Sequence, residues 1–239
     1  MFLLQIGKAV MAVYVLAAVL PAAFLMRYIY RHDRVEREPA FLLAVLTGCG
    51  ILAALASAAL EKIGSNVLDA LVSDRGKMYI LLLAFLVVGA VEEGTKFLLL
   101  KWRTWRSPHF NYRFDGVVYA VFVSLGFAAF ENILYVFSYG LSVALPRALL
   151  AVPAHMGFAV FMGAFYGRAK LCEAWGDETG RKINLWTGYL VAVFLHGFYD
   201  ACAMMGTTLA AVLFAVFVVV MYFVVTRLIR KESREDHPV

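Results

Sequence analysis

The sequence predicts an all-α membrane protein, a polytopic bundle of about seven transmembrane helices. Of its 239 residues 63% are hydrophobic and only 16% are charged, and the mean hydropathy is +0.77. Soluble domains are about half apolar and about a quarter charged, so this composition excludes a soluble domain, a disordered chain and a fibrous repeat. The formal net charge of +5 comes from short basic clusters between apolar runs. That distribution is typical of membrane-protein loops and argues against a nucleic-acid partner.

Seven apolar runs approach the length of about 20 residues that a helix needs to cross a bilayer. The first is too long for a signal peptide, and its arginines follow the run instead of preceding it, so we expect a retained span. The longest loop, 61–77, is predicted to be external, with room for a short interfacial helix. Pro153 is expected to kink the fifth helix, and the tail 231–239 is charged and predicted to be mobile. The expected spans are 10–30, 40–60, 78–100, 116–139, 148–167, 185–205 and 207–228.

The lysines and arginines predict the orientation. Alternate loops carry four sets of four basic residues, and the loops on the other side carry only five. An even number of spans would break this alternation. We therefore expect the N-terminus outside and the C-terminus in the cytoplasm. The four tryptophans lie near predicted cytoplasmic helix ends, as in an aromatic belt, and are Trp102, Trp105, Trp175 and Trp186.

Ionisable residues occur inside four consecutive spans, where each costs about 2.5–3.5 kcal/mol or more. At about 1.5 Å of rise per residue, they lie in one broad layer near mid-bilayer. This convergence predicts one shared site. Packing accounts poorly for so many acidic and imidazole groups at one depth. The residues are Glu92, Glu93 and Lys96; Glu131 and Asn132; His155; and His196 and Asp200.

Spacing within the helices adds detail. Glu92 and Lys96 are four residues apart and share one face, and so do His196 and Asp200. The carboxylate of Asp200 can orient the imidazole of His196. Two adjacent carboxylates in a poorly solvated place do not both ionise easily, which makes one of them a candidate general acid or base. The repeat of small residues from Gly163 to Gly167 predicts close helix contact.

Three five-residue motifs resemble the signature of the PrsW family of intramembrane proteases. Residues 92–96 fit E-E-x-x-K, residues 127–131 fit F-x-x-x-E and residues 196–200 fit H-x-x-x-D. The type II CAAX prenyl endopeptidases are similar, but they carry E-E-x-x-x-R and a histidine where this chain has Lys96 and Glu131. Both departures favour the PrsW branch. The resemblance covers about residues 85–205, half of the chain.

The resemblance implies proteolysis within the bilayer. Carried over by motif position, Glu92 and Glu93 are the essential carboxylates and His196 the essential histidine. Asp200, Glu131 and Lys96 complete the site. His155 lies outside these three motifs and is assigned to the site by depth and chemistry alone. The family's best-known role is cleavage of a membrane-anchored anti-sigma factor, so the expected partners are a membrane-anchored protein substrate and the lipid bilayer.

No serine or cysteine pairs convincingly with a histidine, so we expect direct attack by water. Glu92 or Glu93 takes the proton of the water, and His196, oriented by Asp200, polarises the carbonyl or protonates the leaving nitrogen. Asn132 or Lys96 is expected to help bind the oxyanion. We favour metal-free glutamate chemistry, with no cofactor. Zinc stays open, and its candidate ligands by type are Glu93, Glu131, His155, His196 and Asp200.

Two other function classes use the same buried charges. A proton-coupled transporter or ion pathway is the main alternative, although no inverted repeat is evident. A seven-span receptor or scaffold accounts poorly for the glutamate pair. The three cysteines are far apart and offer neither a disulfide framework nor a metal motif.

The prediction is therefore a single integral membrane protease domain over residues 1–239. Its motif-bearing core covers about 85–205, and a charged cytoplasmic tail covers 229–239. The topology suits the cytoplasmic (inner) membrane of a bacterium.

Overall fold

A computed structural model describes residues 2–239, with side chains from Val10 onward. Its described part consists of helices joined by short turns, without a β-strand. The helices are α1 (Phe2–His32), α2 (Ala40–Leu71), α3 (Lys77–Leu82), a π-helical segment (Leu83–Gly89), α4 (Ala90–Thr104), α5 (Asp115–Tyr139), a 3-10 turn (Leu141–Val143), α6 (Ala144–Leu149), α7 (Ala151–Ala174), α8 (Glu178–Met204) and α9 (Thr208–Arg234).

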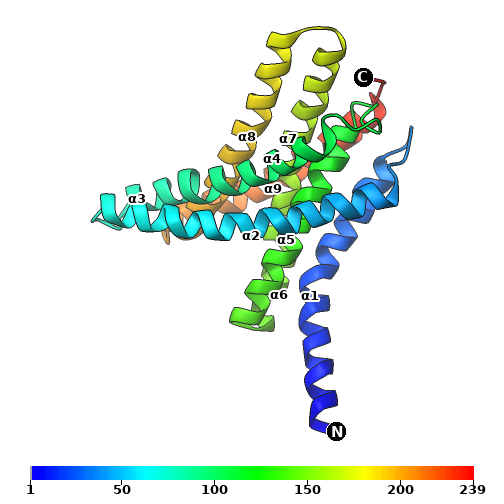
Figure 1. The fold of residues 1–239 in the computed structure, drawn as a ribbon. Coiled ribbons are helices and arrows are strands. Elements are labelled where there is room, and N and C mark those ends of the chain that lie inside the picture. Colours follow the sequence, from blue (N-terminus) through cyan, green and yellow to red (C-terminus); the bar gives the residue numbers. More distant parts are fainter. Residues whose placement is uncertain (1) are drawn as a thin grey trace.

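The helices form the expected bundle around α5 (Figure 1). Within the described residues, six segments are long and apolar enough to cross a membrane. They contain α1, α2, α3 with α4, α5, α6 with α7, and α9. α8 is equally long but less apolar, because it carries polar and ionisable side chains. The chain is therefore an integral membrane protein, and its orientation in the membrane remains a prediction.

α5 is the central helix, and its apolar stretch is 72% buried against its neighbours. α1, α2, α7 and α4 pack around it, while α1 and α9 expose most of their apolar side chains. In Figure 1 the turns after α1, α4 and α7 and the C-terminus lie toward the upper right, and the N-terminus lies at the bottom. The loops predicted to share one side are thus gathered at one end of the molecule.

The prediction of a long loop at 61–77 was wrong. α2 continues to Leu71, and only residues 72–76 link it to α3. The extension is stabilised by tertiary contacts that local sequence does not reveal. A Cβ on Gly64 would lie 3.0 Å from Val87 Cγ1 in the π-helical segment, and the Tyr79 hydroxyl donates a 2.7 Å hydrogen bond to Asp69 Oδ1.

The expected fifth span also differs from the structure. The chain turns at Leu150, and α7 then runs without a break from Ala151 to Ala174. Pro153 lies in the first turn of α7, where its missing N–H needs no partner, so it starts this helix instead of kinking it.

The charged tail was predicted to be mobile. In the structure it packs against the turn that precedes α5. α9 extends to Arg234, and beyond it Arg113 N donates to His237 O at 3.1 Å while Val239 N donates to Asn111 O at 2.9 Å. Phe114 N donates to Asp236 Oδ1 at 2.8 Å. These backbone and side-chain bonds hold the C-terminus in place.

Candidate active site

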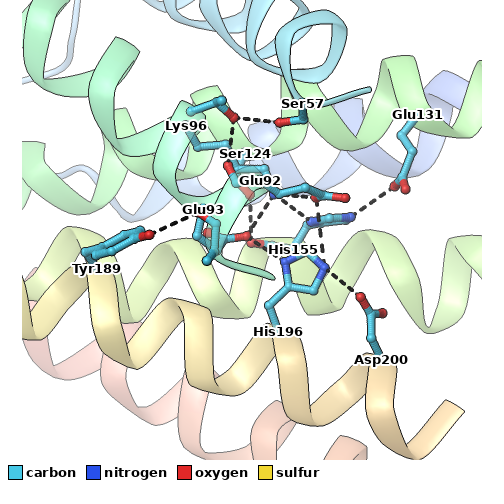
Figure 2. A network of polar contacts seen from close by, with 12 residues as sticks. Ser57, Glu92, Glu93, Lys96, Ser124, Glu131, His155, Tyr189, His196 and Asp200 are labelled. Carbon is cyan, nitrogen blue, oxygen red and sulfur yellow. Dashed lines mark hydrogen bonds and ion pairs between the residues drawn. The ribbon is translucent and has the colours of Figure 1, made fainter. Parts of the chain in front are cut away.

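Four helices bring the predicted site residues together at the centre of the bundle (Figure 2). Glu92, Glu93 and Lys96 lie on the first turns of α4, directly after the π-helical segment. α5 contributes Glu131, α7 contributes His155, and α8 contributes His196 and Asp200. A π-helical turn shifts the register of the residues that follow it and is often found at functional sites. Here it directs two consecutive glutamates of α4 toward α7 and α8.

The Lys96 ammonium connects the two glutamates with His155. Its Nζ lies 3.0 Å from Glu92 Oε2, 2.8 Å from Glu93 Oε1 and 3.3 Å from His155 Nδ1. It also lies 3.9 Å from the centre of the Phe127 ring, which is a cation–π contact. Lys96 is 2% exposed, so its charge is compensated by these groups and not by water.

His196 lies among three carboxylates. Its Nδ1 is 2.9 Å from Glu93 Oε1, and its Nε2 is 3.4 Å from Asp200 Oδ2 and 3.9 Å from Glu92 Oε2. Because both ring nitrogens face carboxylate oxygens, both carry hydrogens in the arrangement that satisfies these contacts. The predicted pairing of His196 with Asp200 is therefore present as a contact.

His155 joins this cluster to Glu131. Its Nδ1 accepts from Lys96, so its Nε2 carries the hydrogen that is donated to Glu131 Oε2 at 3.1 Å. The same Oε2 accepts from Arg147 Nη2 at 2.6 Å. Behind the imidazole, the Ser124 hydroxyl donates to the His155 carbonyl at 2.9 Å. Among the described residues, His155 and Lys96 link Glu131 to the glutamate pair.

A cavity of about 150 Å³ lies beside this network. Glu92 lines it, whereas Glu93 and Lys96 do not. Glu93 is fully buried behind His196. The two adjacent glutamates therefore have different surroundings, and only Glu92 can meet a molecule in the cavity without rearrangement. The ionisable and aromatic residues around the cavity are Glu61, Glu92, Glu131, Tyr135, Arg147, His155, Phe158, His196, Tyr199 and Asp200.

Asn132 does not face the cluster. Its Nδ2 donates to the Ala18 carbonyl of α1 at 3.2 Å, and its Oδ1 accepts from Arg147 Nε. Two residues of the cavity were not predicted: Arg147, which was expected in an external loop, and Glu61, which lies on the unpredicted extension of α2. The sequence feature that could have indicated Arg147 is a lone arginine in an apolar stretch. It lies on the predicted external side, which otherwise has few basic residues.

Four of the side chains could hold a metal ion. One ligand atom from each of Glu92, Glu93, His155 and His196 lies within 4.8 Å of the others. This group includes Glu92, which the predicted ligand set omitted, and it leaves out Glu131 and Asp200. Two imidazoles and two carboxylates suit zinc by type. Glu93 Oε2 is buried and has no hydrogen-bond partner among the described residues, which also fits an additional ligand.

Comparison with known proteins agrees with this geometry. The model of a family described as "PrsW family intramembrane metalloprotease" matches residues 38–227, a range that contains every residue of the cluster. The chain belongs to the PrsW family. Protease PrsW of Clostridioides difficile (strain 630) is 32% identical over 211 residues, which cover 87% of this chain and 86% of that protein. Protease PrsW of Bacillus subtilis (strain 168) is 32% identical over 190 residues, or 77% and 79% of the two chains.

A third relative, Protease PrsW of Halalkalibacterium halodurans, is 35% identical over 156 residues, which cover 65% of this chain and 70% of that protein. No solved structure matches the chain. Membership of the PrsW family makes the chain an intramembrane protease, hence a peptidase that acts on membrane proteins. The predicted family is confirmed, and the transporter alternative finds no support.

Proposed function

We propose that this PrsW-family chain hydrolyses a peptide bond with Glu92 as the general base for an attacking water. The observation that carries the proposal is the different placement of the two glutamates, because Glu92 lines the cavity and Glu93 does not. Glu92 Oε2 and His196 Nε2 are 3.9 Å apart, which is too long for a hydrogen bond but short enough for one water to contact both atoms.

The proposed reaction uses the two groups in sequence. Glu92 takes a proton from the water, and the oxygen of the water attacks the carbonyl carbon of the substrate. The Nε2–H of His196 turns from Asp200 to the oxygen that becomes negative, which stabilises the tetrahedral intermediate. As the C–N bond breaks, Glu92 gives its proton to the leaving nitrogen. Atoms and charges balance, and Glu92 returns to its starting state.

Glu93 and Lys96 act behind the cavity in this scheme. Glu93 holds His196 by Nδ1, so that Nε2 faces the cavity, and Lys96 offsets the charge of both glutamates. Lys96 was expected to help bind the oxyanion. Its ammonium group, however, is already in hydrogen-bond contact with three side chains. We therefore assign Glu93 and Lys96 positioning roles.

The donor set leaves room for a metal-dependent version of this site. Glu92, Glu93, His155 and His196 would hold a divalent ion such as zinc, and when bound such an ion polarises carbonyl groups and acidifies water. The Lys96 ammonium uses three of the same four side chains, so it competes with any ion for them. The family description as a metalloprotease supports a test of zinc.

We infer that the substrate is a membrane-anchored protein that reaches the cavity from the end of the bundle opposite the basic loops. The cavity extends from Glu92 to Arg147 on α6 and to Met204, the last residue of α8, and both lie at that end. An anti-sigma factor with a single span is a substrate of this kind. The basic loops and the bacterial relatives favour the inner membrane of a bacterium as the location.

The test uses proteoliposomes that contain the protein and a panel of single-span membrane proteins, with the product termini read by mass spectrometry. Glu92→Gln should lower cleavage at least a thousandfold because it removes the base. Glu178→Gln, on the exposed start of α8, is the matched control and should cleave at the normal rate. Cleavage by Glu92→Gln at more than a tenth of the normal rate would contradict the proposal.

The metal question has its own measurement. The protein is purified without chelator, its zinc content is measured by mass spectrometry, and cleavage is followed before and after treatment with phenanthroline. Metal-free chemistry predicts substoichiometric zinc and unchanged cleavage. Zinc at one ion per chain, lost together with activity in a His155→Ala variant and after chelation, would establish the metal-dependent version.

A further inference from the structure

A second, larger cavity lies at the basic end of the molecule, away from the proposed active site. It has a volume of about 770 Å³ and is formed by the end of α4, the turn after it, α7 and the start of α8. None of its residues lines the cavity of the proposed active site. Its lining residues are Leu98, Lys101, Trp102, Trp105, Arg106, Lys170, Glu173 and Arg181.

This cavity continues into a slot between α4 and α8. The slot has a volume of about 500 Å³ and shares Leu98, Lys101 and Arg181 with the first cavity. Its other walls are mainly apolar and aromatic. It reaches Tyr189 on α8 and Gly94, the residue after Glu93 on α4. The two spaces together form a basic chamber with an apolar extension toward the interior of the bundle. The remaining walls of the slot are Phe97, Lys182, Leu185 and Trp186.

The charges of the chamber are not balanced from within. Five basic residues and one acidic residue line the two spaces. Glu173 is already engaged, because it accepts from Lys170 Nζ at 2.7 Å and from Trp105 Nε1 at 2.9 Å. Arg181 pairs with Glu178 at 2.6 Å. Among the residues that the structure describes, no carboxylate lies within ion-pair distance of the remaining three, Lys101, Arg106 and Lys182.

The residues around the chamber and slot are typical of the level of lipid headgroups. Leu98, Trp102 and Trp186 are each more than 60% exposed beside the two openings. Tryptophan is enriched at the level of lipid headgroups, and basic pockets between transmembrane helices bind anionic headgroups. A free anion would occupy only the chamber and leave the apolar slot unused. An acidic peptide would likewise contact the charges of the chamber and leave the apolar slot unused.

We propose that this chamber and slot bind one anionic phospholipid, with the phosphate among Lys101, Arg106 and Arg181 and an acyl chain along Leu98 and Leu185. The chamber supplies positive charge to the phosphodiester, and the slot supplies apolar contact for the chain. This assignment goes beyond the proposed peptidase activity and does not depend on it. It would stand even if the role given to Glu92 were wrong.

The experiment uses the full chain, purified in detergent and stripped of lipid. Phosphatidylglycerol is titrated, bound lipid is counted by native mass spectrometry, and thermal unfolding is followed in parallel. We expect one tightly retained lipid per chain and a higher unfolding temperature. Glycerophosphoglycerol, which has the same headgroup without acyl chains, should bind at least tenfold more weakly, and so should phosphatidylcholine. An acidic peptide of glutamates is the competing protein-like ligand and should not bind.

A charge variant tests the location. Lys101→Gln/Arg106→Gln removes two basic groups that pair with no described carboxylate, so its unfolding without lipid should be unchanged. Its affinity for phosphatidylglycerol should fall at least tenfold, since two of the three basic groups assigned to the phosphate are removed. Arg230→Gln/Lys231→Gln removes the same charge from exposed positions on α9 and should bind normally.

Each opposite result would overturn the proposal. Equal binding of glycerophosphoglycerol would show that the apolar slot has no role. Preferential binding of the acidic peptide would assign the chamber to a protein partner. Equal loss of affinity in both charge variants would indicate general electrostatic attraction to the basic end of the molecule instead of a built site.

Discussion

Glu92 and Glu93 are neighbours in the chain, yet they have different tasks in the structure. Glu92 borders the cavity, and Glu93 is enclosed between His196 and Lys96. Residues that follow each other on a helix point about 100° apart, so a pair of this kind can serve two environments at once. One carboxylate can meet the substrate while the other orients the histidine. A motif with a single glutamate could not do both.

Substitution of Arg147 should show how much its contacts with α5 stabilise the fold around the cavity. It pairs with Glu131 at 2.6 Å, bonds Asn132 and lies 3.8 Å from the centre of the Tyr135 ring, all on α5. Arg147→Met leaves the largely buried Glu131 without its strongest partner and should lower the free energy of unfolding by about 2 kcal/mol. Thermal unfolding in detergent would measure this loss.

The control for Arg147 is another arginine pair. Arg75 lies 3.0 Å from Asp69, but its side chain is 70% exposed. Pairs of this kind contribute about 0–1 kcal/mol, so Arg75→Met should leave the unfolding temperature within about 1 °C of the normal value. Equal effects of the two substitutions would mean that Arg147 is only a surface charge.

The sequence was sufficient to identify most of the site and insufficient to assign its roles. Glu92, Glu93, His155 and His196 were predicted together because buried charge is costly and their depths agree. Depth does not give the direction of a side chain, and so Asn132 was wrongly expected at the oxyanion. Arg147 was missed because α6 folds back against α5, and this tertiary arrangement leaves little trace in a short apolar segment.

At the scale of helices, small residues determine how closely the site-bearing elements approach. A Cβ on Gly163 of α7 would lie 2.5 Å from the Gly116 carbonyl oxygen and from Val117 Cα, both on α5. Neither backbone atom can move without separating the helices. Gly163→Ala should therefore lower the free energy of unfolding by about 2 kcal/mol and the unfolding temperature by several degrees.

Gly48→Ala is the matched substitution, because a Cβ at this position of α2 meets nothing within 4 Å. Alanine favours a helix over glycine by about 1 kcal/mol, so this variant should unfold at the same or a higher temperature. A normal unfolding temperature for Gly163→Ala would show that α5 and α7 are less closely packed than described. The close helix contact predicted from the Gly163 to Gly167 repeat is confirmed by these distances.

Helix positions were predicted more reliably than helix ends. Every expected span lies mainly within a helix of the structure, because 20 apolar residues are a strong signal. The ends of α2, α7 and α9 lie 11, 7 and 6 residues beyond the predicted ends, since each extension is stabilised by contacts with a distant segment. The extension of α2 packs on Val87, and that of α9 meets Arg113 through Glu232 at 2.9 Å. Hydropathy contains no information about such partners.

At the scale of the whole molecule, a buried acidic cluster links segments from three parts of the chain. Asp33 and Glu38 lie between α1 and α2, Asp115 starts α5, and Asp236 belongs to the C-terminal tail. The Tyr119 oxygen lies 2.7 Å from Glu38 Oε1 and 2.8 Å from the His109 carbonyl oxygen. The Tyr119 hydroxyl is the donor to both, so its single hydrogen is shared between the two acceptor oxygens.

Burial favours the protonated forms of the carboxyl groups in this cluster. Asp33, Glu38 and Asp115 each have a buried carboxylate oxygen without a hydrogen-bond partner among the described residues. Burial raises the pKa of Asp33 to about 6 and that of Glu38 to about 7, with the neighbouring acids adding to the effect. Burial also raises the pKa of Asp236. These carboxyl groups therefore bind protons more tightly in the folded chain than in the unfolded chain.

The sign of the pH dependence follows from these raised pKa values. A group that binds its proton more tightly when folded stabilises the fold fully at low pH, and this stabilisation is lost as the pH rises toward its folded-state pKa.

For Glu38 the loss of stabilisation between pH 5 and pH 8 should be roughly 2–3 kcal/mol. Glu38→Gln keeps the shape and an acceptor oxygen for Tyr119 but does not titrate. Its unfolding temperature should therefore fall by several degrees less between pH 5 and pH 8 than that of the unmodified chain. Glu36→Gln, at an exposed position in the same turn, should follow the unmodified chain. Thermal unfolding in one detergent at both pH values provides the comparison, and parallel curves for Glu38→Gln and the unmodified chain would mean that Glu38 is already ionised in the fold.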